Sequence, residues 1–368
     1  MDMFAFLAYG SVVLLGTVFV LSIWIVASNT MYVRLEQRNQ NTRNQIKSLM
    51  NKMIVLDNTI QKSASDQATL QKLIRHHKKL VSGVIAQLVN TQGESTRATL
   101  IAGLEAYGLP SIAKETLHSL TSRHQSKRLW AAANLPYLAP ANIAIPALRA
   151  TLADNDNLVS LAAARSLSAL HHSDSACLVI QQLGQRPSIP WTRIIEIIPQ
   201  FGLTAISSLT ESLASQPLSD DQRAITLAAL GVLQATQSEL EIKKYLANQN
   251  KHTRIQAAKA LGNLPAKQSS QALMAGLTDA EWEVRVVCAN ALGKIADPEA
   301  AQALALGLRD PVYWVRYNSA DALSKLGAIG LAQLQQGLQS DDLFARDICH
   351  LVLERIRKIQ PLTQEAQT

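Results

Sequence analysis

The chain has 368 residues and a formal net charge of +7, and three of its residues are cysteines. Cysteines that are odd in number and widely spaced argue against a disulfide framework and against a cysteine-based metal site. Residues 31–90 hold ten Lys or Arg and three Asp or Glu, so they carry the whole net charge. The remainder is nearly neutral, which argues against a nucleic-acid clamp outside this segment.

An uncharged apolar run, residues 4–27, lies near the start of the chain. Its 24 residues are long enough to cross a bilayer as a helix, and Tyr9 and Trp24 suit the two membrane interfaces. A cleaved signal peptide is the rival interpretation, but it would need positive charge ahead of a shorter apolar core. Lys and Arg follow the run and none precedes it. The sequence therefore predicts a transmembrane anchor (residues 1–30) with its N-terminus outside and the rest cytoplasmic, in a bacterial inner membrane.

A basic helical linker is expected over residues 31–83. It contains no Pro and shows apolar residues at alternating steps of three and four: Ile46, Leu49, Met53, Leu56 and Ile60. This heptad pattern predicts a parallel coiled-coil stalk that pairs two copies of the chain through residues 42–84. The alternative is a helical hairpin that turns at residues 63–66 and caps the helices after the linker. Arg75, Lys78 and Lys79 form its densest basic cluster, which is either a surface for anionic headgroups or a solvated helix face.

Beyond the linker, apolar positions recur with a period of 30 to 32 residues. The recurring position, taken from Leu292, is occupied by nine apolar side chains: Leu104, Leu135, Leu167, Ile198, Leu230, Leu261, Leu292, Leu323 and Leu353. Another apolar residue follows three positions later, and in most units a Leu precedes by fifteen. A fixed period of this length is typical of stacked repeats in which each helix pair covers the apolar face of the next.

Seven of the nine units carry Arg seven residues before the recurring position, and Ser160 and Trp191 stand there in the other two. Asp154, Asp279 and Asp310 occur in the turn between the two helices, and Asp341 lies one position later. An Asp in this turn can cap the second helix and accept from an Arg of the adjacent unit. We expect a ladder of Asp and Arg that fixes the stacking. A row of arginines that grips phosphates is the alternative.

The pattern L-x-D-x-x-x-x-V-R-x-x-A-x-x-A-L-G, best matched by residues 278–293 and 309–324, resembles the short HEAT-like repeat of phycobilisome-lyase-type proteins. The resemblance covers about residues 84–357 and implies an all-α fold, an α-solenoid of about nine helical-hairpin repeats. Residues 358–368 are expected to be a polar tail. Arrays of this kind mostly serve as binding scaffolds, and a minority are lyases or DNA-repair glycosylases.

The fourth unit departs from the pattern. Pro187 and Pro190 lie in its turn, and Pro199 lies inside its second helix. Because proline removes a helix hydrogen bond, we expect an irregularity around residues 184–222. Ser219 and Gln222 in the next unit form a capping-box pattern.

The last three units place aromatic residues next to the recurring Arg, in a chain that is only 5% aromatic. Aromatic and Arg side chains are the usual anchors of protein interfaces, although an aromatic at a helix start can also simply pack on the preceding unit. The candidate partner-binding residues are Trp282, Arg285, Tyr313, Trp314, Arg316, Phe344 and Arg346.

No Gly-rich phosphate loop, nucleophile motif or histidine cluster at ligand spacing occurs in the sequence. The sequence thus predicts a membrane-anchored scaffold that binds another protein, in an envelope or regulatory complex, with no catalysis and no cofactor or metal. The alternatives are a HEAT-like lyase or DNA glycosylase-type enzyme, or a lipid or nucleic-acid binder that acts through the basic linker.

Overall fold

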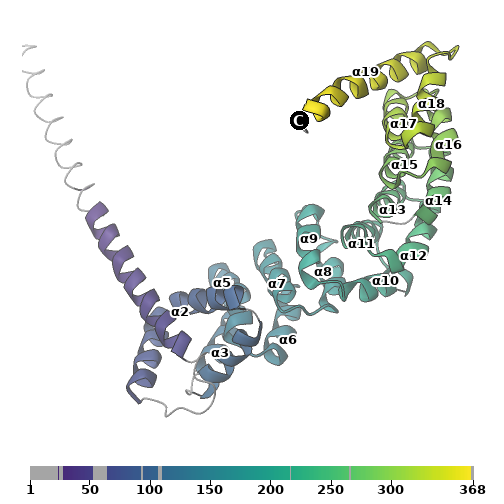
Figure 1. Cartoon of the computed structure of the whole chain (residues 1–368). Helices are drawn as coiled ribbons and strands as arrows, with labels where there is room; N and C mark the ends of the chain where they lie inside the picture. Colours follow the sequence, from purple (N-terminus) through teal and green to yellow (C-terminus); the bar gives the residue numbers. More distant parts are fainter. Residues whose placement is uncertain are drawn as a thin grey trace, which may run out of the picture. The chain divides into compact units, whose positions relative to one another are not determined.

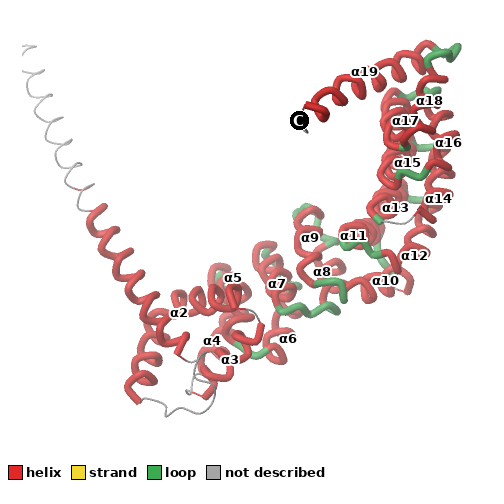
Figure 2. The backbone as a smooth tube through the Cα atoms, in the orientation of Figure 1, coloured by secondary structure: helices red, strands yellow, loops and turns green. Residues whose placement is uncertain are grey.

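The computed structural model describes residues 24, 28–52, 64–92, 94–106, 110–215, 217–264 and 267–365, and every regular element within these ranges is helical. The chain forms two compact units. The first comprises residues 1–122 and 134–143, and the second comprises residues 123–133 and 144–368. The predicted all-α fold is confirmed for the described part of the chain (Figure 2).

The first unit begins with a helical hairpin. A helix through residues 28–52 is followed by α2 (Ala64–Gln92), and Lys52 Nζ near the end of the first lies 3.3 Å from the Asp66 carboxylate near the start of the second. Ile46 and Met50, two side chains that a dimeric stalk would use or flank, are fully buried within a single chain. This burial within one chain favours the hairpin alternative over the dimeric stalk, but the turn predicted at residues 63–66 is wrong, because residues 64–66 are the first residues of α2. Met53, Leu56 and Ile60 of the predicted seam lie outside the described residues.

The predicted membrane localisation needs correction. No helix among the described residues is long and apolar enough to cross a bilayer. This finding contradicts the single-pass, inner-membrane assignment. The predicted span itself, residues 4–27, lies outside the described residues except for Trp24.

The hairpin leads into α3 (Glu94–Ala106) and α4 (Pro110–Leu120). From α5 (Gln125–Leu138) and α6 (Ala141–Thr151) the chain continues as alternating second and first helices of the repeats. The later second helices are α7 (Asn157–Ala169), α9 (Trp191–Ile197), α11 (Asp220–Val232), α13 (Lys251–Asn263), α15 (Trp282–Ile295), α17 (Tyr313–Lys325) and α19 (Leu343–Glu365). The first helices are α8 (Ser175–Leu183), α10 (Ala205–Ser215), α12 (Glu239–Lys244), α14 (Ser270–Ala275), α16 (Ala301–Gly307) and α18 (Gly327–Gly337).

Within the second unit these helices stack in two layers. Helix α11 packs on α13, α13 on α15 and α15 on α17, while the first helices α10, α12, α14, α16 and α18 form the other layer (Figure 1). The recurring apolar side chains lie between the layers: Leu167, Ile198, Leu230, Leu261, Leu292 and Leu323 are all fully buried. The repeat phase counted from the sequence is thus confirmed in this unit, and these side chains form a continuous core.

Consecutive second helices approach each other closely at a Gly that follows the recurring Leu. A Cβ added to Gly262 would lie 2.6 Å from Ala291 Cβ, and one added to Gly293 would lie 2.9 Å from Ala322 Cα. Glycine at this position lets the backbone of one helix touch Ala in the next, so the repeated Ala-Leu-Gly sequence determines how tightly the second helices stack.

The fourth unit is irregular, as predicted. Helix α9 ends at Ile197, and Pro199 lies in the 3₁₀ turn η1 (Ile198–Phe201), which Gly202 closes with φ of 81°. Because proline has no N–H to donate to the α-helical hydrogen-bond pattern, the second helix of this unit is short. In the next unit Ser219 and Gln222 form the predicted capping box.

Candidate protein-binding site

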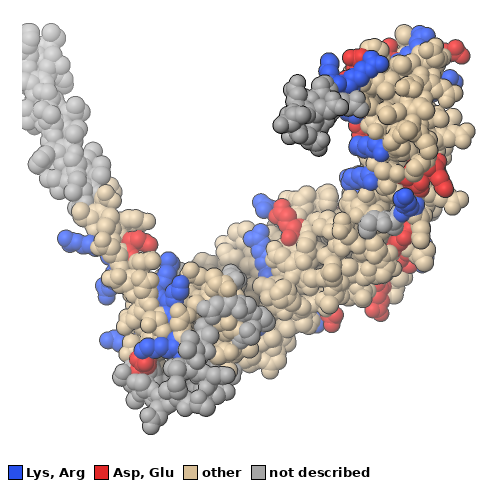
Figure 3. Space-filling view, viewed as in Figure 1, with Lys and Arg blue, Asp and Glu red and all other residues tan. Residues whose placement is uncertain are grey.

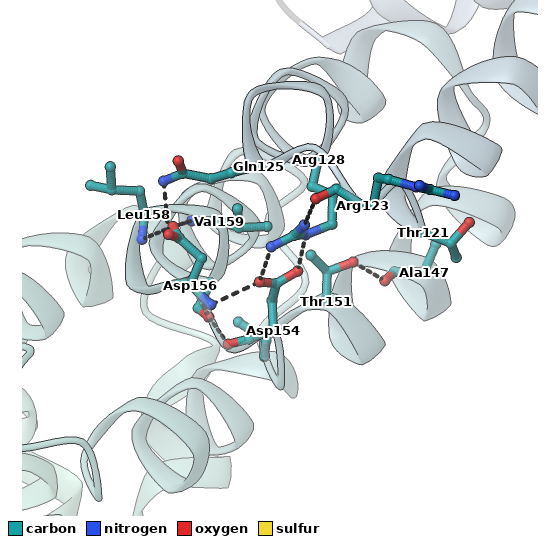
Figure 4. A network of polar contacts seen from close by, with 12 residues as sticks. Thr121, Arg123, Gln125, Arg128, Ala147, Thr151, Asp154, Asp156, Leu158 and Val159 are labelled. Carbon is teal, nitrogen blue, oxygen red and sulfur yellow. Dashed lines mark hydrogen bonds and ion pairs between the residues drawn. The ribbon is translucent and has the colours of Figure 1, made fainter.

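The expected Asp–Arg ladder is present, and its first described rung joins Arg128 to Asp154. Arg128 Nε and Nη2 donate to the two carboxylate oxygens of Asp154 at 2.7 and 3.1 Å (Figure 4). Asp154 Oδ1 also accepts from the backbone N–H of Asp156 at 2.8 Å, and Asp156 caps α7 through the N–H groups of Leu158 and Val159. One carboxylate therefore closes the turn and links two successive units.

Two further rungs have the same geometry. Arg254 holds Asp279 through Nε and Nη2 at 2.7 and 2.8 Å, and Arg285 holds Asp310 at 2.7 and 2.9 Å. In both, Nη1 donates to backbone carbonyls of the turn that precedes its own helix. The backbone thus orients each guanidinium through Nη1, and a carboxylate occupies the edge formed by Nε and Nη2. Arg285, one of the candidate binding residues, is consumed by this internal contact.

Burial raises the pKa of Asp279, but the hydrogen bonds from Arg254 and from the Glu281 N–H outweigh it, so the pKa lies below its usual value. The pKa of Asp154 is lowered in the same way against its burial, by Arg128 and the Asp156 N–H. Both carboxyl groups are therefore ionised at neutral pH and held by arginine, which favours the stacking function of the ladder over a phosphate-binding row.

The ladder does not extend through every unit. Arg223 donates to Asp220 of its own helix, Arg97 donates to the carbonyl of Pro136, and Arg346 is exposed. In each of these units the turn of the following unit lacks an Asp at the ladder position, or no following unit exists within the described residues. The rung expected between Arg316 and Asp341 is also not formed, because Asp341 is exposed.

Arg186 is a ladder residue that the sequence reasoning missed. The third unit has Ser160 where other units have Arg, and Arg186 from the turn of the fourth unit takes the vacant place. Its Nη1 donates to Asp154 O at 2.7 Å and to Ser160 Oγ at 2.9 Å, and its Nη2 donates to Leu152 O at 3.0 Å. Arg186 lies three residues after Leu183, in the turn and not in the second helix where the other ladder arginines lie. The repeat pattern therefore did not point to it.

The predicted aromatic residues lie at the N-terminal ends of three neighbouring second helices. Trp282 begins α15, Tyr313 and Trp314 begin α17, and Phe344 is the second residue of α19. Helix α17 packs against both α15 and α19. The four side chains are 40, 47, 55 and 61% exposed, respectively. They do not pack away into the preceding unit, and we call this set the aromatic row.

Within the aromatic row, Tyr313 and Trp314 are in edge-to-face contact at 5.4 Å between ring centroids. Tyr317, one turn further along α17, stacks on Tyr313 at 6.2 Å and accepts a hydrogen bond from Arg355 Nη1 at 2.9 Å. Arg355 also pairs with Asp321. Tyr317 and Arg355 were not among the predicted residues. Tyr317 could have been found from its spacing of four residues from Tyr313, which places both on one face of a helix.

Arg316 is the candidate residue that contacts the aromatic row directly. Its guanidinium carbon lies 4.9 Å from the centroid of Phe344 and 6.0 Å from that of Tyr313. The side chain is buried although both rings are exposed. This arrangement is a cation–π contact that links the start of α17 to the start of α19.

The basic cluster of the linker lies on α2. Arg75 is exposed there, and the side chains of Lys78 and Lys79 lie outside the described residues. Over the visible face of the second unit, by contrast, basic and acidic side chains are interspersed (Figure 3). On this face, Lys and Arg do not gather into one basic patch, which agrees with the nearly neutral net charge expected for the repeats.

Within the described ranges, no three His, Cys, Asp or Glu side chains are grouped in a way that could hold a metal ion. Cys288 and Cys349 are buried, and Cys177 is partly buried with its thiol donating to Ser208 O at 3.0 Å. Burial raises the pKa of Cys288 to about 12 and that of Cys349 to about 11, so these are core thiols.

Comparison with known proteins agrees with this repeat architecture. A family model described as HEAT repeats matches residues 270–350, and one described as PBS lyase HEAT-like repeat matches residues 253–279. No curated protein sequence matches the chain at a significant level.

Solved structures with similar stacking include an engineered protein, the CpcE–CpcF complex of phycocyanin lyase from Nostoc sp. PCC7120, and Kap121p. The engineered protein is 19% identical, with 85% of this chain and 99% of that chain covered and a TM-score of 0.38. The lyase complex is 18% identical (66% and 94% covered, TM-score 0.29) and Kap121p is 14% identical (89% and 48% covered, TM-score 0.36). Similarities this distant carry no conclusion about this chain. The two family models together match residues 253–350, and for that part of the chain they agree with the stacked helix pairs and the Asp–Arg ladder.

Proposed function

We propose that this HEAT-repeat protein is a scaffold that binds another protein through the aromatic row and carries out no catalysis of its own. The observation that supports the proposal is the exposure of Trp282, Tyr313, Trp314 and Phe344 at one repeat position in three adjacent units. Single exposed apolar side chains are ordinary, whereas neighbouring exposed aromatics beside arginine are typical of interface hot spots.

The carboxylates of the ladder favour this function over a lyase or glycosylase. Such an enzyme would need acidic side chains free to act on a substrate. Asp154, Asp279 and Asp310 are each held by both nitrogens of an arginine fork. They hold successive units together and are not free to act on a substrate.

Site-specific photo-crosslinking in the cells that produce the protein tests the proposal. A benzophenone amino acid replaces Trp314 in one variant and Leu306 in another. Leu306 is the matched control because it is 74% exposed on α16, in the layer of first helices. We expect a discrete adduct from position 314 that is absent from position 306 and is lost when Trp282 and Phe344 are changed to Ala.

Two outcomes would contradict the scaffold function at this surface. Adducts of equal yield from positions 314 and 306 would indicate non-specific contact, and the absence of any adduct from position 314 would show that no protein binds over Trp314. Circular dichroism of each variant confirms that the helices are retained, because all replaced side chains are exposed.

A further inference from the structure

The last ladder position has its arginine but lacks its carboxylate. Arg316 Nη1 donates to Asp310 O at 2.7 Å and to Pro311 O at 3.1 Å, just as Arg285 Nη1 donates to Asp279 O and Ala280 O at 2.8 and 3.3 Å. The backbone therefore holds both guanidinium groups in the same orientation. At Arg285 the remaining edge, Nε and Nη2, grips Asp310, whereas Arg316 Nε is buried and has no hydrogen-bond partner.

The missing carboxylate is explained by one residue. Ser340 occupies the place of Asp310 in the next turn, two residues after Leu338 as Asp310 is two after Leu308. Ser340 Oγ accepts from the Asp342 N–H at 3.2 Å, as Asp310 Oδ1 accepts from the Val312 N–H at 2.8 Å. Serine therefore makes the turn contact of the ladder but supplies no charge to the arginine. We call Arg316 with Ser340 the open rung.

Nearby acidic residues do not fill the open rung. Asp341 is exposed, and Asp342 accepts from the backbone N–H groups of Phe344 and Ala345 at the start of α19. Arg316 is only 9% exposed, so its charge is largely removed from water without an ion pair. A buried guanidinium without a carboxylate is costly, and the cation–π contacts with Phe344 and Tyr313 offset only part of that cost.

The aromatic contacts leave the hydrogen-bonding edge of the guanidinium available. Phe344 and Tyr313 lie against its face, at 4.9 and 6.0 Å from the guanidinium carbon. Carboxylates bind in the plane of the group, at the Nε–Nη2 edge. Because Arg316 Nε is buried, a ligand reaches this edge only if the Phe344 side chain, which is 61% exposed, changes its rotamer. The open rung is thus a carboxylate site inside the aromatic row.

We propose that the open rung binds an Asp side chain of the partner protein, presented in an extended segment whose neighbouring apolar residues lie on Tyr313 and Trp314. This inference rests on the proposed function and names the chemistry of the partner. Aspartate is favoured because every occupied rung of the described ladder holds an aspartate in the same fork. A phosphate dianion is disfavoured by the adjacent carboxylates of Asp341 and Asp342.

The first part of the test supplies the missing carboxylate from the chain itself. Ser340→Asp places a carboxylate where Asp310 stands in the preceding unit, and Ser340→Asn is the matched neutral control. In the full chain, we expect Ser340→Asp to raise the thermal midpoint by about 2 °C relative to Ser340→Asn, because Arg316 gains its partner. Equal midpoints for the two variants would overturn the inference, since the fork would then not accept a carboxylate.

The second part uses a phage library of random 16-residue peptides, selected on the full chain and then on the two Ser340 variants. We expect enriched peptides with a fixed Asp flanked by apolar residues. Asp→Asn in the peptide, Ser340→Asp and Arg316→Gln should each weaken binding at least about tenfold, while Ser340→Asn, which adds no charge beside Arg316, should weaken it clearly less than Ser340→Asp does.

The outcomes separate this inference from the proposed function. Peptides that bind through Trp314 but lack an acidic residue, or that keep their affinity for Ser340→Asp, would refute the open rung and leave the scaffold function standing. Enrichment of phosphopeptides over Asp peptides in a parallel synthetic array, or of peptides bound only by a free C-terminal carboxylate, would also refute it. A selection that yields no binder at all would count against both.

Discussion

Arg254 and Asp279 lie 25 residues apart in the chain and share two hydrogen bonds of 2.7 and 2.8 Å that join one repeat to the next. The same aspartate accepts the N–H of Glu281 at 2.9 Å and so closes its own turn. The carboxylate therefore couples a local structure to a tertiary contact. Its removal would loosen both the turn and the α13–α15 stack.

The first prediction concerns this rung. We expect Asp279→Asn to destabilise the array by about 1–3 kcal/mol, because the substitution leaves a half-buried guanidinium without its ion pair. Arg254→Leu with Asp279→Leu should cost less than the sum of the single changes, because no unpaired charge remains. Urea unfolding followed by circular dichroism gives the loss, and hydrogen exchange should localise it to α13 and α15. Uniform loss of protection along the whole array would contradict a local rung.

The second prediction is a pH dependence with a defined sign. The folded-state pKa of Asp154 and Asp279 lies below the usual value, so each carboxylate contributes stability that is present above its unfolded pKa and is lost as pH falls through the folded pKa. We expect the urea midpoint to fall below about pH 4, and to fall less in an Asp154→Asn, Asp279→Asn double variant. Asp341→Asn, whose carboxylate is exposed and outside the ladder, is the control and should follow the unmodified chain.

The repeat architecture could be predicted from the sequence because every unit must bury an apolar side chain at the same position. Leu261, Leu292 and Leu323 must be buried between layers, and a residue buried in every unit leaves a fixed period in the chain. The ladder was predictable for the same reason, since Arg254 with Asp279 and Arg285 with Asp310 recur at one spacing. The aromatic row was visible as a departure from a composition poor in aromatics.

The features that escaped prediction are those in which a residue of one unit takes a role that the repeat pattern assigns to another position. Arg186 comes from the wrong unit by the counting rule, and only its contacts with Asp154 O and Ser160 Oγ show that it completes the third unit. Arg316 lacks a carboxylate because Ser340, and not Asp341, occupies the ladder position of its turn. The sequence pattern did not distinguish these two adjacent positions. The linker was ambiguous because a seam that pairs two chains and one that pairs two helices of a hairpin have the same heptad pattern.

The third prediction concerns the close contact between second helices. We expect Gly262→Ala to destabilise the array by about 1–3 kcal/mol, because its Cβ would lie 2.6 Å from Ala291 Cβ and 2.8 Å from Ala291 Cα, and α13 and α15 would have to separate. The control is Gly83→Ala on α2, where a Cβ meets nothing within 4 Å. That change should be neutral or stabilising by up to about 1 kcal/mol through helix propensity. If both variants lowered the urea midpoint relative to the unmodified chain by a similar amount, this account would be contradicted.

The fourth prediction concerns the buried cysteines. The Cys288 thiol lies beneath Gly276, where an added Cβ would be 2.4 Å from Sγ, and burial raises its pKa to about 12. At pH 8 the thiolate fraction is then roughly one in ten thousand, and the thiolate is the reactive form. We expect iodoacetamide to modify Cys177, which is partly exposed, well before Cys349 and Cys288. Mass spectrometry of timed samples gives the order.

Labelling of Cys288 should also report on the stability of the array. If alkylation requires local unfolding, its rate will rise in Asp279→Asn, because that change loosens the turn that runs from Gly276 to Asp279 beside the thiol, and will not rise in Asp341→Asn. An identical rate in both variants would show that the reagent reaches Cys288 in the folded protein, and the packing of this turn on α15 would then be looser than the contact between Gly276 and Cys288 implies.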